Sequence, residues 1–196
     1  MTRMFAAAVP PDDVVEDLDD FLSARRAAAP FRWTLPEHWH VTLAFMAQVP
    51  DRSLDDLSDR LTRATAKRTA MTVRVAGGGA FPHPDRGRVL VAGLELDGGP
   101  DDVEELRRLA VGARAAAGKA GATVDGQRFH PHLTLARLGH PDNLTRWVRL
   151  LDGYRGPAWS LDEIALVASY LGEGPRKLPR YEVVETFRLA PGAVQG

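Results

Sequence analysis

A short strand-like motif occurs twice in the sequence, once in each half of the chain. Residues 39–45 read WHVTLAF and residues 131–137 read PHLTLAR, so the pattern His-x-Thr-Leu recurs after 92 residues. Apolar and polar side chains alternate in both copies, and this period of two is typical of a strand with one buried face. A motif repeated at this distance in a chain of 196 residues indicates a duplicated unit.

The elements around the two motifs follow the same order in both halves. Hydrophobic periodicity and turn residues predict helices at 12–29, 101–120 and 142–151. Another helix is predicted after Ser53, which can cap it, with Leu54, Leu57 and Leu61 as its apolar stripe. The same signals predict strands at 3–9, 39–46, 71–77, 88–96, 132–138, 161–171 and 180–189. A shift of 92 residues moves the strand at 71–77 onto 163–169 and the strand at 88–96 onto 180–188.

This order predicts an α+β fold with two lobes related by a pseudo-twofold axis. Each lobe is expected to be an antiparallel sheet with helices on its outer face, and the active-site cleft is expected between the lobes. No linker or low-complexity segment separates the halves. We therefore expect residues 1–196 to form a single bilobal domain, with approximate repeat units 12–96 and 101–189.

The alternation of a strand divides each motif between two faces. His40 and Thr42 share one face, and Val41 and Leu43 share the other, which can pack under the helices. In the second copy, His132 and Thr134 likewise face away from Leu133 and Leu135. If the polar faces of the two lobes oppose each other, two imidazoles and two hydroxyls line one cleft. Strict alternation assigns Arg137 to the leucine face.

Two histidines on opposite sides of one substrate atom suit acid–base catalysis. The ordinary pKa of histidine is about 6.5, so one imidazole can be neutral and the other protonated near neutral pH. One can then activate water while the other protonates a leaving oxygen, and the threonine hydroxyls can donate to anionic oxygens. This set of groups suits in-line attack at phosphorus without a metal ion, with a rate that is bell-shaped in pH around neutrality.

Composition excludes several other classes of site. The chain has no cysteine, which excludes disulfides, thiolate metal sites and a cysteine nucleophile. Its net charge is −1, so no global basic field indicates binding of long nucleic acid. The amino-terminal apolar run is too short for a signal peptide and no segment is long enough for a membrane span, so we expect a cytoplasmic protein. The basic segment 174–180 (GPRKLPR) is interpreted as a solvated turn.

The paired motifs resemble the HxTx pair of the 2H phosphoesterase superfamily. The resemblance is strongest to the RNA 2′,3′-cyclic phosphodiesterase family, whose members are also called 2′–5′ RNA ligase-like. It covers nearly the whole chain, including RMFAAAVP, RWTLPEHWHVTLAFM, GAFPHPDRGRVLVAGLE, FHPHLTLARL and the closing SYLGEGPRKLPRYEVVETFRL. The run AFMAQVP after the first motif departs from the family, which usually has glycine there.

The resemblance implies an activity and a role for each motif residue. It implies hydrolysis of RNA or nucleotide 2′,3′-cyclic phosphates to 2′-phosphate ends, with a reversible 2′–5′ ligation as the related reaction. His40 matches the family's proton donor and His132 its proton acceptor, while Thr42 and Thr134 match the motif threonines. Arg137 continues the second motif and is expected to contact phosphate. We expect no cofactor, no membrane partner and a monomer.

Two other interpretations remain open at this point. His38 and His40 form one H-x-H pair and His130 and His132 form another, so four imidazoles could converge on a transition metal. That interpretation leaves both threonines without a role. A non-catalytic RNA or nucleotide binder is the second alternative, but it would need exposed aromatic and basic residues, and only 7% of the chain is aromatic.

Overall fold

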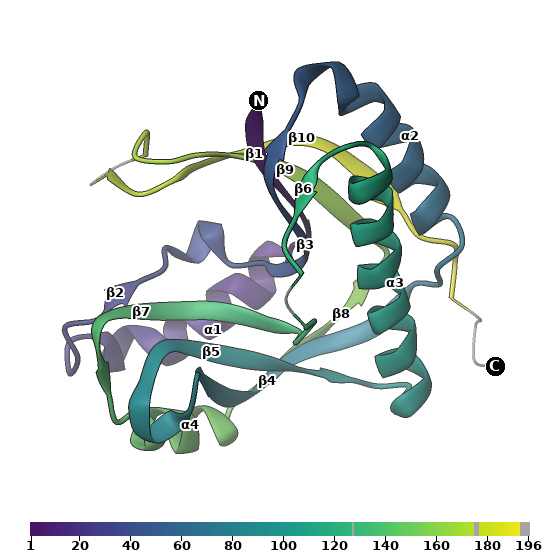
Figure 1. The fold of residues 1–196 in the computed structure, drawn as a ribbon. Coiled ribbons are helices and arrows are strands. Elements are labelled where there is room, and N and C mark those ends of the chain that lie inside the picture. Colours follow the sequence, from purple (N-terminus) through teal and green to yellow (C-terminus); the bar gives the residue numbers. More distant parts are fainter. Residues whose placement is uncertain (127, 175–176, 193–196) are drawn as a thin grey trace.

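The computed structural model describes residues 1–126, 128–174 and 177–192 as an α+β fold built on one antiparallel sheet (Figure 1). The strands follow the order β10-β9-β1-β3-β7-β5-β4-β8, with short β2 paired to β7 and short β6 paired to β3. The strands of the first lobe are β1 (Thr2–Ala8), β3 (Val41–Val49), β6 (Thr123–Val124), β9 (Glu163–Tyr170) and β10 (Arg180–Arg188). Those of the second lobe are β2 (Arg32–Trp33), β4 (Met71–Phe81), β5 (Gly87–Leu96), β7 (His132–Asp142) and β8 (Arg155–Leu161).

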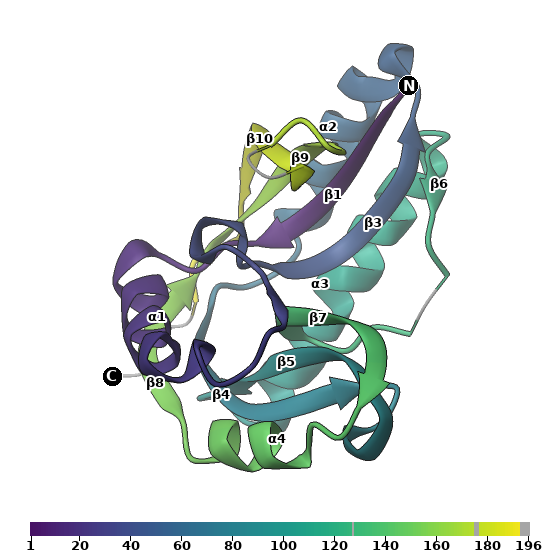
Figure 2. The same ribbon diagram turned by 90° about the vertical axis from the view of Figure 1, so that its left-hand side faces the viewer.

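The two lobes meet where the motif strands lie side by side. β3 and β7 are antiparallel neighbours, and their register pairs Val41 with Leu133. From this junction the two halves of the sheet diverge, with β1 and β3 above and β7 and β5 below (Figure 2). The predicted pair of antiparallel lobes is confirmed, and the meeting of β3 with β7 brings the two motifs together.

Helices cover the outer faces of both lobes. α2 (Leu54–Thr65) and α3 (Pro100–Lys119) pack against each other, and α3 also lies against β3. On the second lobe, α4 (Thr145–Asp152) packs on β4 and α1 (Asp12–Arg26) packs on β8. Within the described part of the chain, no helix combines the length and apolarity that a membrane span requires.

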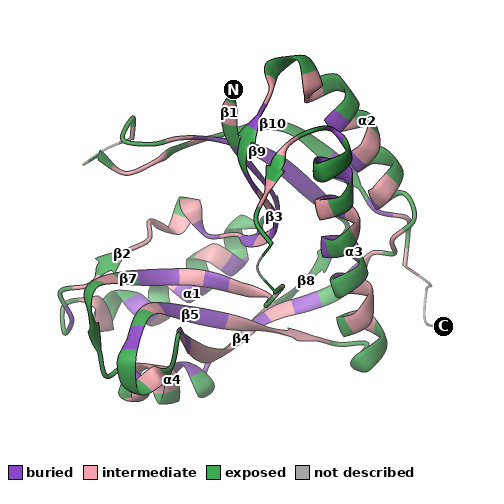
Figure 3. Cartoon of the chain, viewed as in Figure 1, coloured by how far each residue is buried: buried purple, intermediate pink, exposed green. Residues whose placement is uncertain are grey.

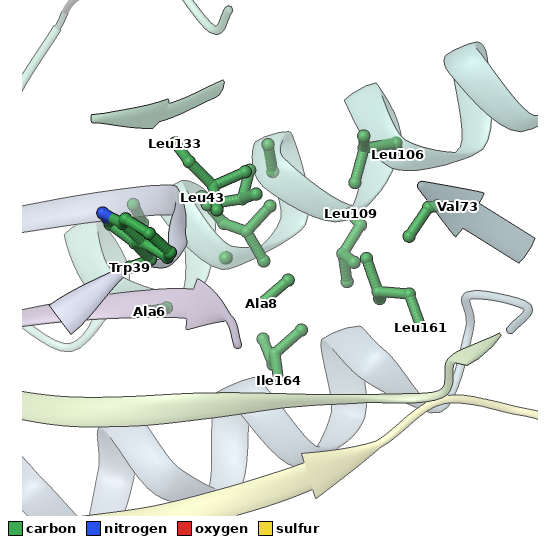
Figure 4. Packing of buried hydrophobic residues seen from close by; sticks show 14 of the residues in the cluster. Ala6, Ala8, Trp39, Leu43, Val73, Leu106, Leu109, Leu133, Leu161 and Ile164 are labelled. Carbon is green, nitrogen blue, oxygen red and sulfur yellow. The ribbon is translucent and has the colours of Figure 1, made fainter. Parts of the chain in front are cut away.

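The leucine faces of both motifs form part of a single core shared by the lobes. Val41, Leu43, Leu133 and Leu135 are each at most 1% exposed and belong to one continuous cluster. In Figure 4, Leu43 and Leu133 lie next to each other, and Leu106 and Leu109 of α3 lie farther along the same cluster. The buried segments of Figure 3 run along both halves of the sheet. The predicted packing of the apolar motif faces under the helices is confirmed.

Most predicted elements are present, with small shifts at their ends. The first helix ends at Arg26 rather than at residue 29, and the fourth helix begins at Thr145 rather than at 142. Ser53 precedes α2 as predicted but makes no capping hydrogen bond, because it lies in a 3-10 turn with helical backbone angles (φ −98°, ψ −1°) instead of the extended conformation of a cap.

One long strand was not predicted from the sequence. β8 contains Gly156 and Pro157, residues that are rare inside strands. β8 is an edge strand of the sheet and, among the described strands, pairs only with β4. Proline has no N–H, but on the unpaired side of an edge strand no ladder hydrogen bond is lost. Its edge position therefore accounts for a strand that propensity alone does not indicate.

The sheet order refines the expected correspondence between the halves. β9 and β4 are each separated from the motif strand of their lobe by one strand, so they occupy equivalent places, as the shift of 92 residues predicts. β5 and β10 are not equivalent, because β5 lies next to β7 whereas β10 is the outer strand beyond β9. In the first lobe the place next to the motif strand belongs to β1. The division into units 12–96 and 101–189 remains a prediction.

Candidate active site

The polar faces of the two motifs line a single pocket. His40 and Thr42 from the first lobe and His132 and Thr134 from the second all border a cavity of about 160 Å³. His40 lies immediately before β3, and His132 is the first residue of β7. Because β3 and β7 are antiparallel neighbours, the fold delivers one imidazole and one hydroxyl from each lobe to the same space.

Each motif imidazole is held by the backbone two residues before it. Nδ1 of His40 lies 2.7 Å from the carbonyl oxygen of His38, and Nδ1 of His132 lies 2.6 Å from the carbonyl oxygen of His130. A carbonyl oxygen can only accept a hydrogen bond, so Nδ1 donates in both rings. Both neutral imidazoles therefore carry their proton on Nδ1, and Nε2 of each histidine is left for proton exchange.

The surroundings of the two imidazoles differ. The Phe5 ring stacks on His40, with centroids 4.3 Å apart and planes 15° from parallel, and Tyr181 approaches the same imidazole edge-on at 5.7 Å. His132 instead meets Phe81 edge to face at 5.1 Å. The first imidazole is therefore more tightly enclosed by aromatic rings than the second.

Burial lowers the pKa of both motif histidines. Loss of solvation, only partly offset by the hydrogen bond to the His38 carbonyl, lowers the pKa of His40 from 6.5 to about 4. Loss of solvation is also the largest cause of the lowered pKa of His132, and the positive charge of Arg137 adds to it. Both imidazoles of the free protein are therefore neutral near pH 7.

A bulge in each motif strand changes which residues reach the pocket. In β3, Thr42 and Ala44 pair with the adjacent residues Ala7 and Ala6, so one extra residue, Leu43, interrupts the ladder. Both Leu43 and Ala44 are consequently buried, and the following Phe45 returns to the side of the histidine.

The same irregularity occurs in β7 and corrects the expected orientation of Arg137. Thr134 and Ala136 pair with the adjacent residues Val91 and Leu90, which leaves Leu135 as the extra residue. The alternation is shifted by one, and Arg137 lines the pocket with His132 and Thr134. Strict alternation had assigned this arginine to the leucine face, and that expectation was wrong.

Phe45 and Arg137 occupy equivalent places in the two motifs, yet both lobes present a cation. The guanidinium of Arg3 on β1 lies 4.4 Å from the centre of the Phe45 ring and also lines the pocket. No carboxylate is present among the lining residues as the structure describes them. Two guanidinium groups, hydroxyl donors and two imidazoles make a pocket suited to an anion.

Several pocket residues were not predicted from the sequence. Besides Arg3 and Phe45, these residues are Phe5, Thr34, Ser169 and Tyr181, whereas the sequence indicates His38, which also lines the pocket, only as a metal ligand. Ser169 and Tyr181 are paired across β9 and β10, far from both motifs in the sequence. The one sequence signal for Ser169 is a polar residue within the otherwise apolar strand ending ALVASY.

The structure does not gather the four histidines that a metal centre would need. His38 borders the pocket and contacts the Tyr181 ring at 4.5 Å, but His130 is not among the lining residues. Within the described residues there is no group of three or more histidine, aspartate or glutamate side chains that could hold a metal ion. The carbonyl groups of His38 and His130, rather than their rings, serve the motif imidazoles.

Known proteins resemble this chain in both sequence and fold. The model of the 2′-5′ RNA ligase superfamily matches residues 10–173. An RNA 2′,3′-cyclic phosphodiesterase of Thermus thermophilus is 33% identical, over 95% of this chain and 90% of that protein. A protein of the same name from Aeropyrum pernix is 33% identical over 66% of this chain and 69% of its own length.

Solved structures of proteins with related sequences share the fold of this chain. The structure of TT0787 of Thermus thermophilus has a TM-score of 0.74 at 28% identity, covering 96% of this chain and 98% of that one. LigT of E. coli shares the fold with a TM-score of 0.71 and 22% identity, over 96% and 98% of the two chains. The chain therefore belongs to the 2′-5′ RNA ligase superfamily of phosphoesterases, the superfamily that its two matched motifs resemble.

Proposed function

We propose that the protein hydrolyses 2′,3′-cyclic phosphates at RNA or nucleotide ends, with His40 and His132 as its acid–base pair. The observation that carries the proposal is the pair of imidazoles held alike through Nδ1 at one pocket with two threonines and two arginines. The shared name of the relatives from Thermus thermophilus and Aeropyrum pernix, RNA 2′,3′-cyclic phosphodiesterase, supports the same substrate class.

The size of the pocket suits the end of a chain rather than a whole ligand. At about 160 Å³ it is smaller than the roughly 300–1,000 Å³ of pockets that enclose a complete small molecule. A phosphate group and the adjoining part of a ribose fill such a space, and the remaining nucleotide lies outside. A pocket of this kind accepts an RNA end without reading many bases.

The proposed reaction is a single in-line displacement at phosphorus. His132 accepts a proton from water through Nε2 while the water oxygen forms a bond to phosphorus. The bond from phosphorus to O3′ breaks on the opposite side, and His40 donates its proton to O3′. Thr42, Thr134 and Arg137 donate hydrogen bonds to the non-bridging oxygens, whose negative charge they stabilise.

The role of His40 as the acid depends on the bound substrate. In the free protein its pKa is about 4, so the imidazole is neutral and has no proton to give from Nε2 at pH 7. A phosphate anion beside the ring favours the charged form and raises this pKa, as any nearby opposite charge does. His40 therefore takes up its proton together with the substrate.

The test of the proposed function is turnover of a panel of 2′,3′-cyclic nucleotides and oligoribonucleotides that end in a cyclic phosphate. We expect hydrolysis in the presence of excess EDTA, because the proposed chemistry uses side chains alone. Activity that is lost with EDTA and restored by zinc or manganese would favour the H-x-H metal centre. Tight binding without turnover would instead identify a non-catalytic RNA binder.

The pH dependence of kcat/KM is expected to be bell-shaped, with its optimum on the acid side of pH 6.5. The singly protonated pair is the active form, and both pKa values of the free protein lie below the ordinary 6.5. The profile of kcat, which reports the substrate complex, is expected at higher pH because the bound anion raises these values. Coincident profiles for kcat and kcat/KM would contradict uptake of the proton with the substrate.

The product is expected to carry its phosphate on O2′, because the resemblance of the paired motifs to the RNA 2′,3′-cyclic phosphodiesterase family implies that O3′ leaves. The lobes present different side chains at equivalent places, Phe45 in one and Arg137 in the other, so an asymmetric ribose end binds in one orientation. The phosphorus NMR spectrum of the product, and its resistance to a phosphatase specific for 3′-phosphates, measure the outcome. A 3′-phosphate would reverse the orientation of the ribose, and an equal mixture would show that the pocket does not fix it.

A further inference from the structure

A second cavity lies on the outer face of the first lobe, between α2 and α3. It measures about 450 Å³, and both helices, which lie on the right of Figure 1, contribute to its walls. From α2 and the residues that follow it come Arg60, Arg63, Lys67 and Arg68. From α3 come Arg107, Arg108 and Lys119. We call this cavity the α2/α3 groove.

The α2/α3 groove is strongly basic in a chain whose net charge is only −1. Among its lining residues, as the structure describes them, there is no aspartate or glutamate. Three carboxylates outside the lining neutralise part of the charge: Asp56 pairs with Arg60, Glu105 with Arg68, and Glu104 with both Arg107 and Arg108.

Three cations of the groove keep their charge free for a ligand. Within residues 1–126, 128–174 and 177–192, Arg63, Lys67 and Lys119 form no ion pair, and all three side chains are exposed. Arg63 and Lys67 are four residues apart, so they project from the same side of α2 and its extension. Their mutual repulsion is relieved when an anion lies between the helices.

The shape of the groove suits an extended anion. Its lining includes four small residues, namely Ala64, Gly112, Ala115 and Ala116, so a ligand can approach the helix backbones closely. From Arg108 to Lys119 the groove follows α3 for about 17 Å at 1.5 Å per residue. Successive phosphates of one strand lie ~3.4 Å apart along the axis of a duplex, so this length accommodates about five of them, or fewer when the strand is extended.

We infer that the α2/α3 groove binds the phosphate backbone of single-stranded RNA, at a place separate from the histidine pocket. The choice of RNA among polyanions rests on the proposed function, because the substrate of the histidine pocket is itself an RNA end. No aromatic residue lines the groove as described, so the contacts are to phosphate and carry no base specificity. Val111 is the one large exposed apolar side chain in the lining, too little for insertion into a lipid surface.

The test measures binding of RNA without a cyclic end. A fluorescent single strand of about 12 nucleotides ending in a 3′-hydroxyl is titrated with the full chain by fluorescence anisotropy at ~50–200 mM salt. The variant Arg63→Glu/Lys67→Glu is expected to bind roughly tenfold or more weakly. Its slope of log affinity against log salt should be shallower by about 1.4, since each phosphate contact on a single strand contributes about 0.7.

Arg146→Glu/Arg149→Glu is the matched control, because it changes the net charge equally and both residues are exposed helical arginines on α4 of the other lobe. We expect this variant to bind RNA like the wild type. Equal losses in the control and the groove variant, or no loss in either, would overturn the inference. Displacement of RNA by polyglutamate of equal charge as readily as by unlabelled RNA would also overturn it, because the groove would then accept any polyanion.

Turnover of a 2′,3′-cyclic mononucleotide separates this inference from the proposed function. A mononucleotide does not reach the outer face, so both glutamate variants should hydrolyse it with wild-type kcat/KM and retain the wild-type melting temperature. Failure of the wild type to hydrolyse the mononucleotide would reject the proposed function. The anisotropy titrations decide independently whether the α2/α3 groove binds RNA.

Discussion

Replacement of His40 or His132 by alanine is expected to lower kcat for a 2′,3′-cyclic nucleotide by roughly 10²–10⁴-fold, the usual contribution of a positioned acid or base. The double variant should lose less than the product of the two single losses, because the pair acts on one displacement. Steady-state kinetics at the optimum pH of each variant measure the effect. Wild-type turnover in either single variant would contradict the assignment.

His140→Ala provides the matched control for these variants. His140 is an exposed histidine of β7, the strand that carries His132, but it does not line the pocket. Its replacement should leave kcat and KM unchanged. Melting temperatures of all the variants show whether a loss of activity reflects the missing imidazole or a disturbed fold.

A sulfur-substituted substrate distinguishes the acid from the base. When sulfur replaces O3′ in the cyclic phosphate, the leaving thiolate is stable without a proton, so the acid is no longer needed. His40→Ala should then recover most of its lost rate, whereas His132→Ala should remain slow, because water still needs a base. Recovery in His132→Ala instead would exchange the two roles.

The sequence predicts the motif residues and the faces of their strands because both depend on local alternation. His40, Thr42, His132 and Thr134 lie at one pocket, and the apolar residues between and after them are buried, as a period of two requires. The repetition of the motif adds the information that both strands serve the same space. This part of the fold follows from residues that are near one another in the chain.

The bulges are the reason that strict alternation fails three residues beyond each threonine. An extra residue at Leu43 or Leu135 leaves no mark in the local pattern, because leucine and alanine suit either face of a strand. Only the partner strand shows that the ladder is interrupted. Strict alternation consequently places Phe45 and Arg137 on the wrong side.

Residues from distant segments could not be predicted because the sheet order is not local. β1 lies between β3 and β9, and this order brings Arg3, Phe5 and Ser169 to the pocket of the first motif. Tyr181 comes from β10, beyond β9. The basic segment 174–180 that the sequence analysis singled out falls partly outside the described residues, so its interpretation as a solvated turn remains a prediction.

Arg137→Ala is expected to lower kcat/KM roughly 10- to 100-fold, because the loss of a charge-assisted hydrogen bond to phosphate costs about 1.5–3 kcal/mol. Arg137→Lys should retain part of the activity, since lysine keeps the charge but not the planar pair of donors. Arg188→Ala is the matched control, an exposed arginine of β10 outside the pocket. Equal kinetics for Arg137→Ala and the wild type would exclude the phosphate contact.

A second measurement separates contact with phosphate from a structural role of Arg137. The guanidinium lowers the pKa of His132 through its positive charge, so its removal should raise the pKa of this imidazole in the free protein. The lysine variant should keep the pKa near that of the wild type. NMR titration of the ring protons of His132 reports the change without substrate. A structural disturbance would expose the ring and raise the pKa in both variants, whereas the electrostatic effect appears only when the charge is lost.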